Sequence, residues 1–303
     1  MSNTFLIQVN EMKFSWLVTK EQEGKRLEQV LRREYGFSRR LVTRLKYYGE
    51  ALINGKPAIA ITPLRTGDEV HVYVPEVIEP QPPQDIPLRI LYEDNHLIII
   101  NKAPGMVCHP TKGYPQGTLA NALSHYWQQR GEAHPARLVT RLDKDTSGLV
   151  LAAKSAWSHY RLSAGNLCKQ YYGITRGIPH PTAGEIEQPI GMLPGNPSRL
   201  GVNPSGKAAL TRYETENILG NLALVRLSPV TGRTHQLRIH MAWLGCPLVD
   251  DYLYGREEGL LGRTALHAYA LRFRHPATGE PLEFIAPLPE DMKGVINTGE
   301  VTE

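Results

Sequence analysis

A dense polar cluster stands directly before an apolar run in the middle of the chain. Residues 141–148 read R-L-D-K-D-T-S-G, and the apolar run 149–151 follows. Asp143, at such a junction between a loop and a buried strand, would be held rigidly while its carboxylate stays accessible. An adjacent cation keeps a carboxylate ionised, as a nucleophile requires. The cluster therefore predicts a catalytic carboxylate. A capped turn is the alternative interpretation without chemistry, since Asp, Thr, Ser and Gly all favour turns.

A second group of side chains is the pair Lys169 and Tyr171, two residues apart in a β-type run. Alternate residues of a strand share one face, so this cation and this ring are expected to point the same way. Tyrosine rings stack well on nucleobases. A tyrosine of the core is the alternative interpretation. We expect the pair to line a binding cleft.

A third cluster, residues 231–240, reads T-G-R-T-H-Q-L-R-I-H. Thr234 is placed to cap the helix that the following apolar spacing predicts. His235 and Arg238 are three residues apart and are therefore expected on one helix face. His235 and His240 are five apart, the wrong spacing for two metal ligands on one face. We expect His235 and Arg238 in a site and no metal.

The elements that must position these clusters belong to a strand-rich domain. Glycine and proline number 27 and 23 of 303 residues, which favours turns and strands over a helical bundle. The expected strands cover 97–100, 149–153, 171–175, 222–227 and 271–273, and the expected helices cover 119–130 and 234–244. This mixture predicts an α+β domain over 88–289 around a largely antiparallel mixed β-sheet. The polar segment 290–303 is expected to be a flexible tail.

The beginning of the chain predicts a small α/β module of its own over 15–75. Two short helices are expected between residues 27 and 46, then a strand entering a hairpin at Asn54-Gly55, and a further strand over 69–74. Residues 76–87 contain four prolines, which argues against a helix or a central strand. This segment is expected to be an extended linker between the two domains.

Positive charge is concentrated in this module. Between Arg32 and Lys46 six cations stand against one acid, although the whole chain carries a net charge of only +4. Arg39, Arg40, Arg44 and Lys46 are expected to lie off the apolar stripe of the second helix. Such a local excess predicts contact with the phosphates of a nucleic acid. A solvated helix face is the alternative interpretation.

The overall composition excludes several protein classes. The hydrophobic share of 41% and the charged share of 21% argue against global disorder. No apolar run reaches about 18 residues, and the first ten residues lack the pattern of a signal peptide, so neither a membrane span nor secretion is expected. Cys108, Cys168 and Cys246 are far apart, which fits a reducing cytoplasm without a disulfide framework.

Taken together and in order, these motifs resemble those of the RluA-type pseudouridine synthases. The resemblance rests on R-L-D-K-D-T-S-G-L-V-L, K-Q-Y and T-G-R-T-H-Q-L-R-I-H. The segment Glu93–Pro110 is similar to the opening strand and loop of that family, and Leu266–Ala268 and Arg274–Phe284 resemble its closing strands. The first module resembles an S4 RNA-binding domain. The resemblance implies an enzyme that isomerises uridine within RNA to pseudouridine, without a cofactor or a metal.

The resemblance also implies a role for each residue. Asp143 matches the essential nucleophile, which attacks either the ribose or the base. Arg141 matches the arginine that takes the place of the flipped uridine, because a stacked base hides its glycosidic bond. Tyr171 matches the tyrosine that stacks on the target base and assists proton removal. Arg238 matches the partner of the catalytic carboxylate, and Leu237 an apolar residue beside it. Lys169 and His235 are expected to contact the substrate.

Two other hypotheses compete with this one. The basic helices alone fit a non-catalytic RNA-binding or ribosome-assembly factor on the same scaffold. Asp143 and Asp145, two residues apart, fit a glycosidase acting on a small nucleoside or sugar. The complete set of Asp143, Tyr171 and Arg238 favours the synthase. The S4-like module points to large-subunit rRNA as the substrate, with tRNA as the other candidate. No surface for self-association is legible, so a monomer is expected.

Overall fold

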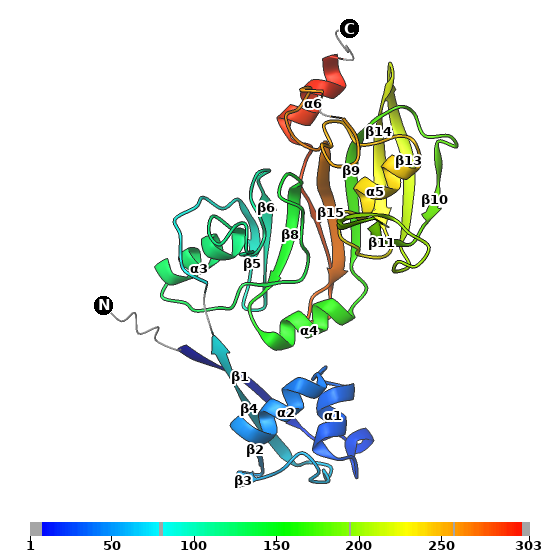
Figure 1. Ribbon diagram of the computed structural model, residues 1–303. Coiled ribbons are helices and arrows are strands. Elements are labelled where there is room, and N and C mark those ends of the chain that lie inside the picture. Colours follow the sequence, from blue (N-terminus) through cyan, green and yellow to red (C-terminus); the bar gives the residue numbers. More distant parts are fainter. Residues whose placement is uncertain (1–7, 79–80, 194, 257, 299–303) are drawn as a thin grey trace.

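The computed structural model describes residues 8–78, 81–193, 195–256 and 258–298. A small N-terminal module and a larger domain follow one another along the chain (Figure 1). The larger domain carries all three polar clusters of the sequence. We therefore describe the module briefly and the domain for what it positions.

The N-terminal module consists of a four-stranded antiparallel sheet and two α-helices. Its elements are β1 (Gln8–Leu17), a 3₁₀ turn (Lys20–Gln22), α1 (Leu27–Arg33), α2 (Arg39–Tyr48), β2 (Glu50–Ile53), β3 (Lys56–Pro57) and β4 (Glu69–Ile78). The sheet order is β1-β4-β2-β3. Asn54 and Gly55 adopt φ values of 52° and 75° and form the predicted hairpin turn. Ser38 caps α2 by accepting the Leu41 amide.

The segment after this module differs from the expected linker over 76–87. β4 continues to Ile78, and the Glu76 side chain is only 2% exposed and accepts two hydrogen bonds from Arg137. Residues 81–89 have no regular structure, as four prolines require, but they are not free. The side-chain amide of Asn121 donates to the Pro82 carbonyl at 2.8 Å, and the backbone amide of Gly117 donates to the side-chain oxygen of Gln84. Hydrogen bonds to the larger domain therefore hold this stretch in place.

The larger domain is built on one mixed sheet in which almost every neighbouring pair is antiparallel. Its main path runs β10-β13-β14-β9-β15-β8-β6-β5, with β16 on β15 and β7 on β8. Only the pair β15 and β8 is parallel within this described sheet. The elements are β5 (Ile90–Glu93), β6 (Leu97–Lys102), α3 (Leu119–Gln129), β7 (Arg137–Leu138), β8 (Ser147–Ala153), α4 (Ala156–Ala164), β9 (Cys168–Arg176), β10 (Ala183–Glu187), β11 (Ile190–Leu193), β12 (Asn196–Val202), β13 (Leu210–Leu219), β14 (Leu222–Pro229), α5 (Gln236–Trp243), β15 (Leu266–Arg274), β16 (Pro281–Ile285) and α6 (Glu290–Thr298).

The parallel pair lies at the centre of the sheet, directly after the Asp143 loop. Gly148 pairs with Ala268 there and adopts φ = 110°. A Cβ atom on Gly148 would lie 2.3 Å from the Ala268 carbonyl oxygen. Only glycine fits both the backbone conformation and the close approach of the two strands. The loop that carries Asp143 is therefore anchored at its end by a strand buried along its whole length.

Two local expectations are wrong. The segment 290–303 is not a flexible tail throughout, because 290–298 form α6 with Met292 fully buried. Met292, Val295 and Ile296 follow helical spacing and pack against the sheet. Thr234 does not cap α5: the cap residue is His235, in the left-handed conformation with φ = 57°. Among the described residues no helix has the length and apolar character needed to span a bilayer.

Candidate active site

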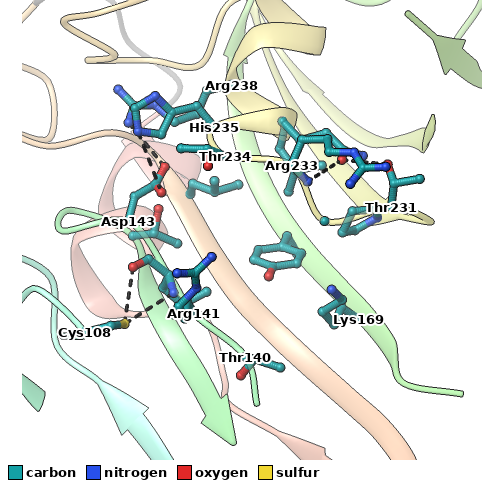
Figure 2. Close-up of a pocket in the computed structure, with 18 of the residues that line it drawn as sticks. Cys108, Thr140, Arg141, Asp143, Lys169, Thr231, Arg233, Thr234, His235 and Arg238 are labelled. Carbon is teal, nitrogen blue, oxygen red and sulfur yellow. Dashed lines mark hydrogen bonds and ion pairs between the residues drawn. The ribbon is translucent and has the colours of Figure 1, made fainter. Parts of the chain in front are cut away.

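The three polar clusters meet around one cavity of about 410 Å³. Its walls come from the loop before β8, from β9, and from the turn that leads into α5 (Figure 2). The volume falls in the usual range for small-molecule sites. All the site residues expected from the sequence in this domain line the cavity: Asp143, Tyr171, Arg238, Arg141, Leu237, Lys169 and His235.

Asp143 and Arg238 form the charged pair of the cavity. Arg238 Nη1 lies 3.3 Å from Asp143 Oδ2, although the two residues are 95 positions apart (Figure 2). The side chain of Asp143 is 29% exposed and that of Arg238 only 5%. The carboxylate is thus accessible from the cavity, while the guanidinium supports it from the protein side. This arrangement suits a carboxylate that must attack a bound molecule.

Arg238 has a second and stronger partner that the sequence did not suggest, Asp251. Two hydrogen bonds of 2.7 Å join the guanidinium to both oxygens of this fully buried carboxylate. Asp251 also accepts the Leu253 and Tyr254 amides. The only signal in the sequence is a pair of acids in V-D-D-Y-L-Y-G after an apolar run. Asp251 fixes the direction in which Arg238 points.

His235 lies beside the same carboxylate. Its Nε2 is 3.9 Å from Asp143 Oδ1, and its Nδ1 is 2.9 Å from the Tyr254 hydroxyl. Burial lowers the pKa of His235, so the ring is neutral at pH 7. His240 points elsewhere and bonds Thr211 and the Gln188 carbonyl. The two histidines do not converge, as their spacing predicts.

Tyr171 and Leu237 supply an apolar and stacking surface in the cavity. Tyr171 is 9% exposed, and Leu237 belongs to the same buried cluster. Burial raises the pKa of the Tyr171 phenol well above its ordinary value, so the ring is neutral. Lys169 also lines the cavity, and burial lowers its pKa. Arg141 is exposed and reaches the cavity from the loop end.

Buried side chains anchor the backbone of the loop that carries Asp143. The Lys102 ammonium is 1% exposed and donates to the Lys144 carbonyl at 3.0 Å, as well as to two carbonyls of its own loop. Burial lowers the pKa of Lys102 to about 8. Cys108 Sγ lies 3.3 Å from both the amide and the carbonyl of Leu142. Arg263 donates to the Asp145 carbonyl at 3.3 Å. These contacts fix the backbone on both sides of Asp143.

The basic residues of α2 do not line this cavity. Arg39, Arg40 and Lys46 are exposed, and Arg44 is half-buried, while Leu41 and Leu45 are buried beneath them. The structure thus confirms the predicted separation of the charged face from the apolar stripe. It offers a second, separate basic surface.

Comparison with known proteins identifies the family of this chain. The RNA pseudouridylate synthase family matches residues 96–243, which include all three clusters. The chain is 39% identical over 270 residues to an uncharacterised RNA pseudouridine synthase of Bacillus subtilis, covering 87% of this chain and 95% of the relative. It is 38% identical over 299 residues to the ribosomal large subunit pseudouridine synthase D of Vibrio parahaemolyticus, with 91% of each chain covered.

A solved structure supports the same assignment. Human RNA pseudouridylate synthase domain containing 4 superimposes with a TM-score of 0.55 at 25% identity, covering 69% of this chain and 92% of that one. The sequence relatives extend over nearly the whole chain, and the family match spans the cavity. This chain therefore belongs to the RNA pseudouridine synthases, the enzymes that isomerise uridine within RNA.

Proposed function

We propose that this chain converts one or more uridines of large-subunit rRNA to pseudouridine, with Asp143 as the nucleophile. The observation that carries the nucleophile is the accessible Asp143 carboxylate beside the buried Arg238, at 3.3 Å. The names of relatives at 38% and 36% identity, ribosomal large subunit pseudouridine synthase D, support this substrate class.

The reaction exchanges one bond between ribose and base for another. The bond from C1′ to N1 breaks, the uracil turns, and C1′ joins C5; N1 gains a proton and C5 loses one, so the product is an isomer. Asp143 attacks either C1′ or the base and is released when the new bond has formed. Arg238 stabilises the carboxylate, and Asp251 holds Arg238 in place.

The uridine must leave the base stack to reach Asp143. Arg141, exposed at the cavity, fits the vacated position in the RNA helix. Tyr171 supplies the ring on which the flipped base stacks. Because its phenol is neutral at pH 7, we assign Tyr171 to base stacking rather than to proton transfer. Lys169 and His235, which also line the cavity, fit as further substrate contacts.

The N-terminal module fits an S4-like RNA-binding role. Its exposed cations on α2, Arg39, Arg40 and Lys46, with Arg44 beside them, suit phosphate contacts. Neutralising a phosphate contact weakens binding of every RNA sequence and reduces its salt dependence. The proposed division of labour is affinity from this module and chemistry from the cavity.

Tritium release tests the function and the nucleophile together. RNA labelled at C5 of uridine, either large-subunit rRNA or bulk tRNA, is incubated with wild type and with Asp143→Asn. We expect release by the wild type from rRNA alone, and none by Asp143→Asn, with unchanged RNA binding. Release by Asp143→Asn at the wild-type rate would remove the nucleophile assignment. Release from tRNA alone would correct the substrate class. Tight rRNA binding by the wild type without release would favour the assembly-factor hypothesis.

A further inference from the structure

Two exposed tyrosines and a lysine stand at the mouth of the cavity, outside the residues used so far. Tyr114 is 46% exposed and Tyr252 is 59% exposed. Lys144, the residue directly after Asp143, is exposed as well. Large exposed rings are not needed for the core, and both lie on loops that border the catalytic groups. A base-stacking surface is the function that such rings serve best.

The Tyr114 backbone is held against the cavity wall. Thr111 and Tyr114 exchange two backbone hydrogen bonds of 3.0 Å each, which closes a tight turn. Thr111 lines the cavity, whereas Tyr114 does not, so the turn carries the ring outward to the rim. A ring on a closed turn loses little freedom when a base stacks on it.

Tyr252 is held on the other side by the group that orients Arg238. It follows Asp251, whose carboxylate accepts the Leu253 and Tyr254 amides immediately after it. The Arg238 guanidinium lies 5.6 Å from the centre of the Tyr252 ring. One side of the ring therefore meets the catalytic arginine, while more than half of the residue remains exposed.

Lys144 lies against the Tyr114 ring. Its ammonium lies 5.1 Å from the centre of the Tyr114 ring and 3.3 Å from the Tyr114 hydroxyl. A cation on the face of the Tyr114 ring, one residue from the nucleophile, is suited to a phosphate next to a base that stacks on that ring.

We infer that Tyr114, Lys144 and Tyr252 form a subsite for the nucleotide next to the target uridine in the RNA strand. A uridine drawn into the cavity brings its strand neighbours to the mouth, where they have lost their own stacking partner. One of the rings replaces that partner, and Lys144 pairs with the connecting phosphate. The inference rests on the proposed function, in that the cavity must receive a flipped uridine of some RNA.

A cycle of enzyme and RNA changes tests this subsite. The RNA is a stem-loop cut from the RNA that the wild type modifies in the tritium assay, with the target uridine kept. It is made with natural bases, or with an abasic nucleotide directly 5′ or 3′ of that uridine. Binding is measured by fluorescence anisotropy in the Asp143→Asn background, which prevents turnover. Tyr114→Ala, Tyr252→Ala and Lys144→Met are compared with Tyr252→Phe. Tyr160→Ala serves as a matched control, since Tyr160 is 41% exposed on α4.

Tyr114→Ala or Tyr252→Ala, whichever removes the ring that stacks on the neighbouring base, should bind the natural stem-loop about 10-fold more weakly than the parent enzyme. An abasic nucleotide at one of the two neighbouring positions should weaken RNA binding by the parent enzyme by the same factor. It should not weaken RNA binding by that alanine variant any further. Tyr252→Phe and Tyr160→Ala should bind like the parent, and Lys144→Met should reduce the salt dependence. Additive losses from the abasic nucleotide and from both tyrosine variants would overturn the subsite. The substrate class is decided separately, by which RNA releases tritium.

Discussion

At the scale of single residues, the site depends on how one arginine is shared between two acids. Arg238 gives its two shortest bonds, of 2.7 Å, to Asp251 and a longer one of 3.3 Å to Asp143. Burial opposes the positive charge of Arg238, but the bonds to Asp251 raise its pKa. Asp251 thus balances the charge of Arg238 and fixes its orientation. The Asp143 carboxylate contacts Arg238 and remains accessible from the cavity. Asp251 is a positioning residue that never needs to touch RNA.

We therefore predict that Asp251→Ala damages both stability and turnover. Removing one partner of a buried ion pair leaves the other uncompensated, so the free energy of unfolding should fall by about 3–5 kcal/mol. A misdirected Arg238 should lower kcat by about 100-fold with a smaller change in KM. Urea unfolding and tritium release measure the two effects. Glu283→Ala, which breaks the exposed Arg272–Glu283 pair, is the control and should cost less than about 1 kcal/mol. Wild-type kcat in Asp251→Ala would refute the positioning role.

At the scale of elements, the catalytic loop is defined by the strand it enters. The loop is held by Lys102, Cys108 and Arg263 and then passes into β8 through Gly148. At Gly148 the chain runs parallel to β15, and the two backbones lie too close together for any residue with a Cβ atom at this position. The position of Asp143 is therefore set by strand pairing as much as by its own contacts.

Gly148→Ala should separate β8 from β15 and displace the loop. The added methyl group would lie 2.3 Å from the Ala268 carbonyl oxygen and on a backbone with φ = 110°. We expect a loss of at least about 2 kcal/mol in urea unfolding, together with a fall in kcat. Gly294→Ala in α6 is the matched control, because nothing lies within 4 Å of its added Cβ atom. That variant should gain up to about 1 kcal/mol from helix propensity. A fully stable and active Gly148→Ala enzyme would contradict the strand-anchoring argument.

The elements also show what the sequence could predict and what it could not. An apolar run predicted β8 around Leu149, turn chemistry predicted the Asn54-Gly55 hairpin, and helical spacing predicted the separation of Arg39 from the buried stripe. The spacing of His235 and Arg238 predicted one helix face. Both side chains do approach Asp143, but His235 is the cap residue before α5 and not part of the helix. Asp251 was missed because it lies in a loop 13 positions after Arg238, and neither helical nor strand spacing predicts a contact between a helix residue and such a loop. The order in which strands pair is likewise a tertiary property.

At the scale of the whole molecule, the two parts of the chain share a core. Trp157, at the start of α4 in the larger domain, packs with the apolar residues of the N-terminal module. Its indole donates to the Tyr35 carbonyl at 2.6 Å, and its ring lies 5.6 Å from that of Phe14. Glu76 of β4 completes the contact by accepting the Ala156 amide and the Arg137 guanidinium. The basic face of α2 is thereby held in a fixed relation to the cavity, which suits binding of one RNA by both.

This shared core predicts a local effect of Trp157→Ala. Losing a buried tryptophan should cost about 3–5 kcal/mol, and the loss should fall on the N-terminal module. Amide hydrogen exchange should therefore accelerate in 27–45 and stay slow in β8, since β8 has its own core. RNA binding should weaken, while kcat on bound RNA stays near wild type. Trp157→Phe keeps an aromatic ring but loses the hydrogen bond to Tyr35. Its amide exchange over 27–45 and its RNA binding should lie between those of the wild type and of Trp157→Ala. Unchanged exchange over 27–45 in Trp157→Ala would mean that the module folds without the larger domain and that its orientation is not set by this contact.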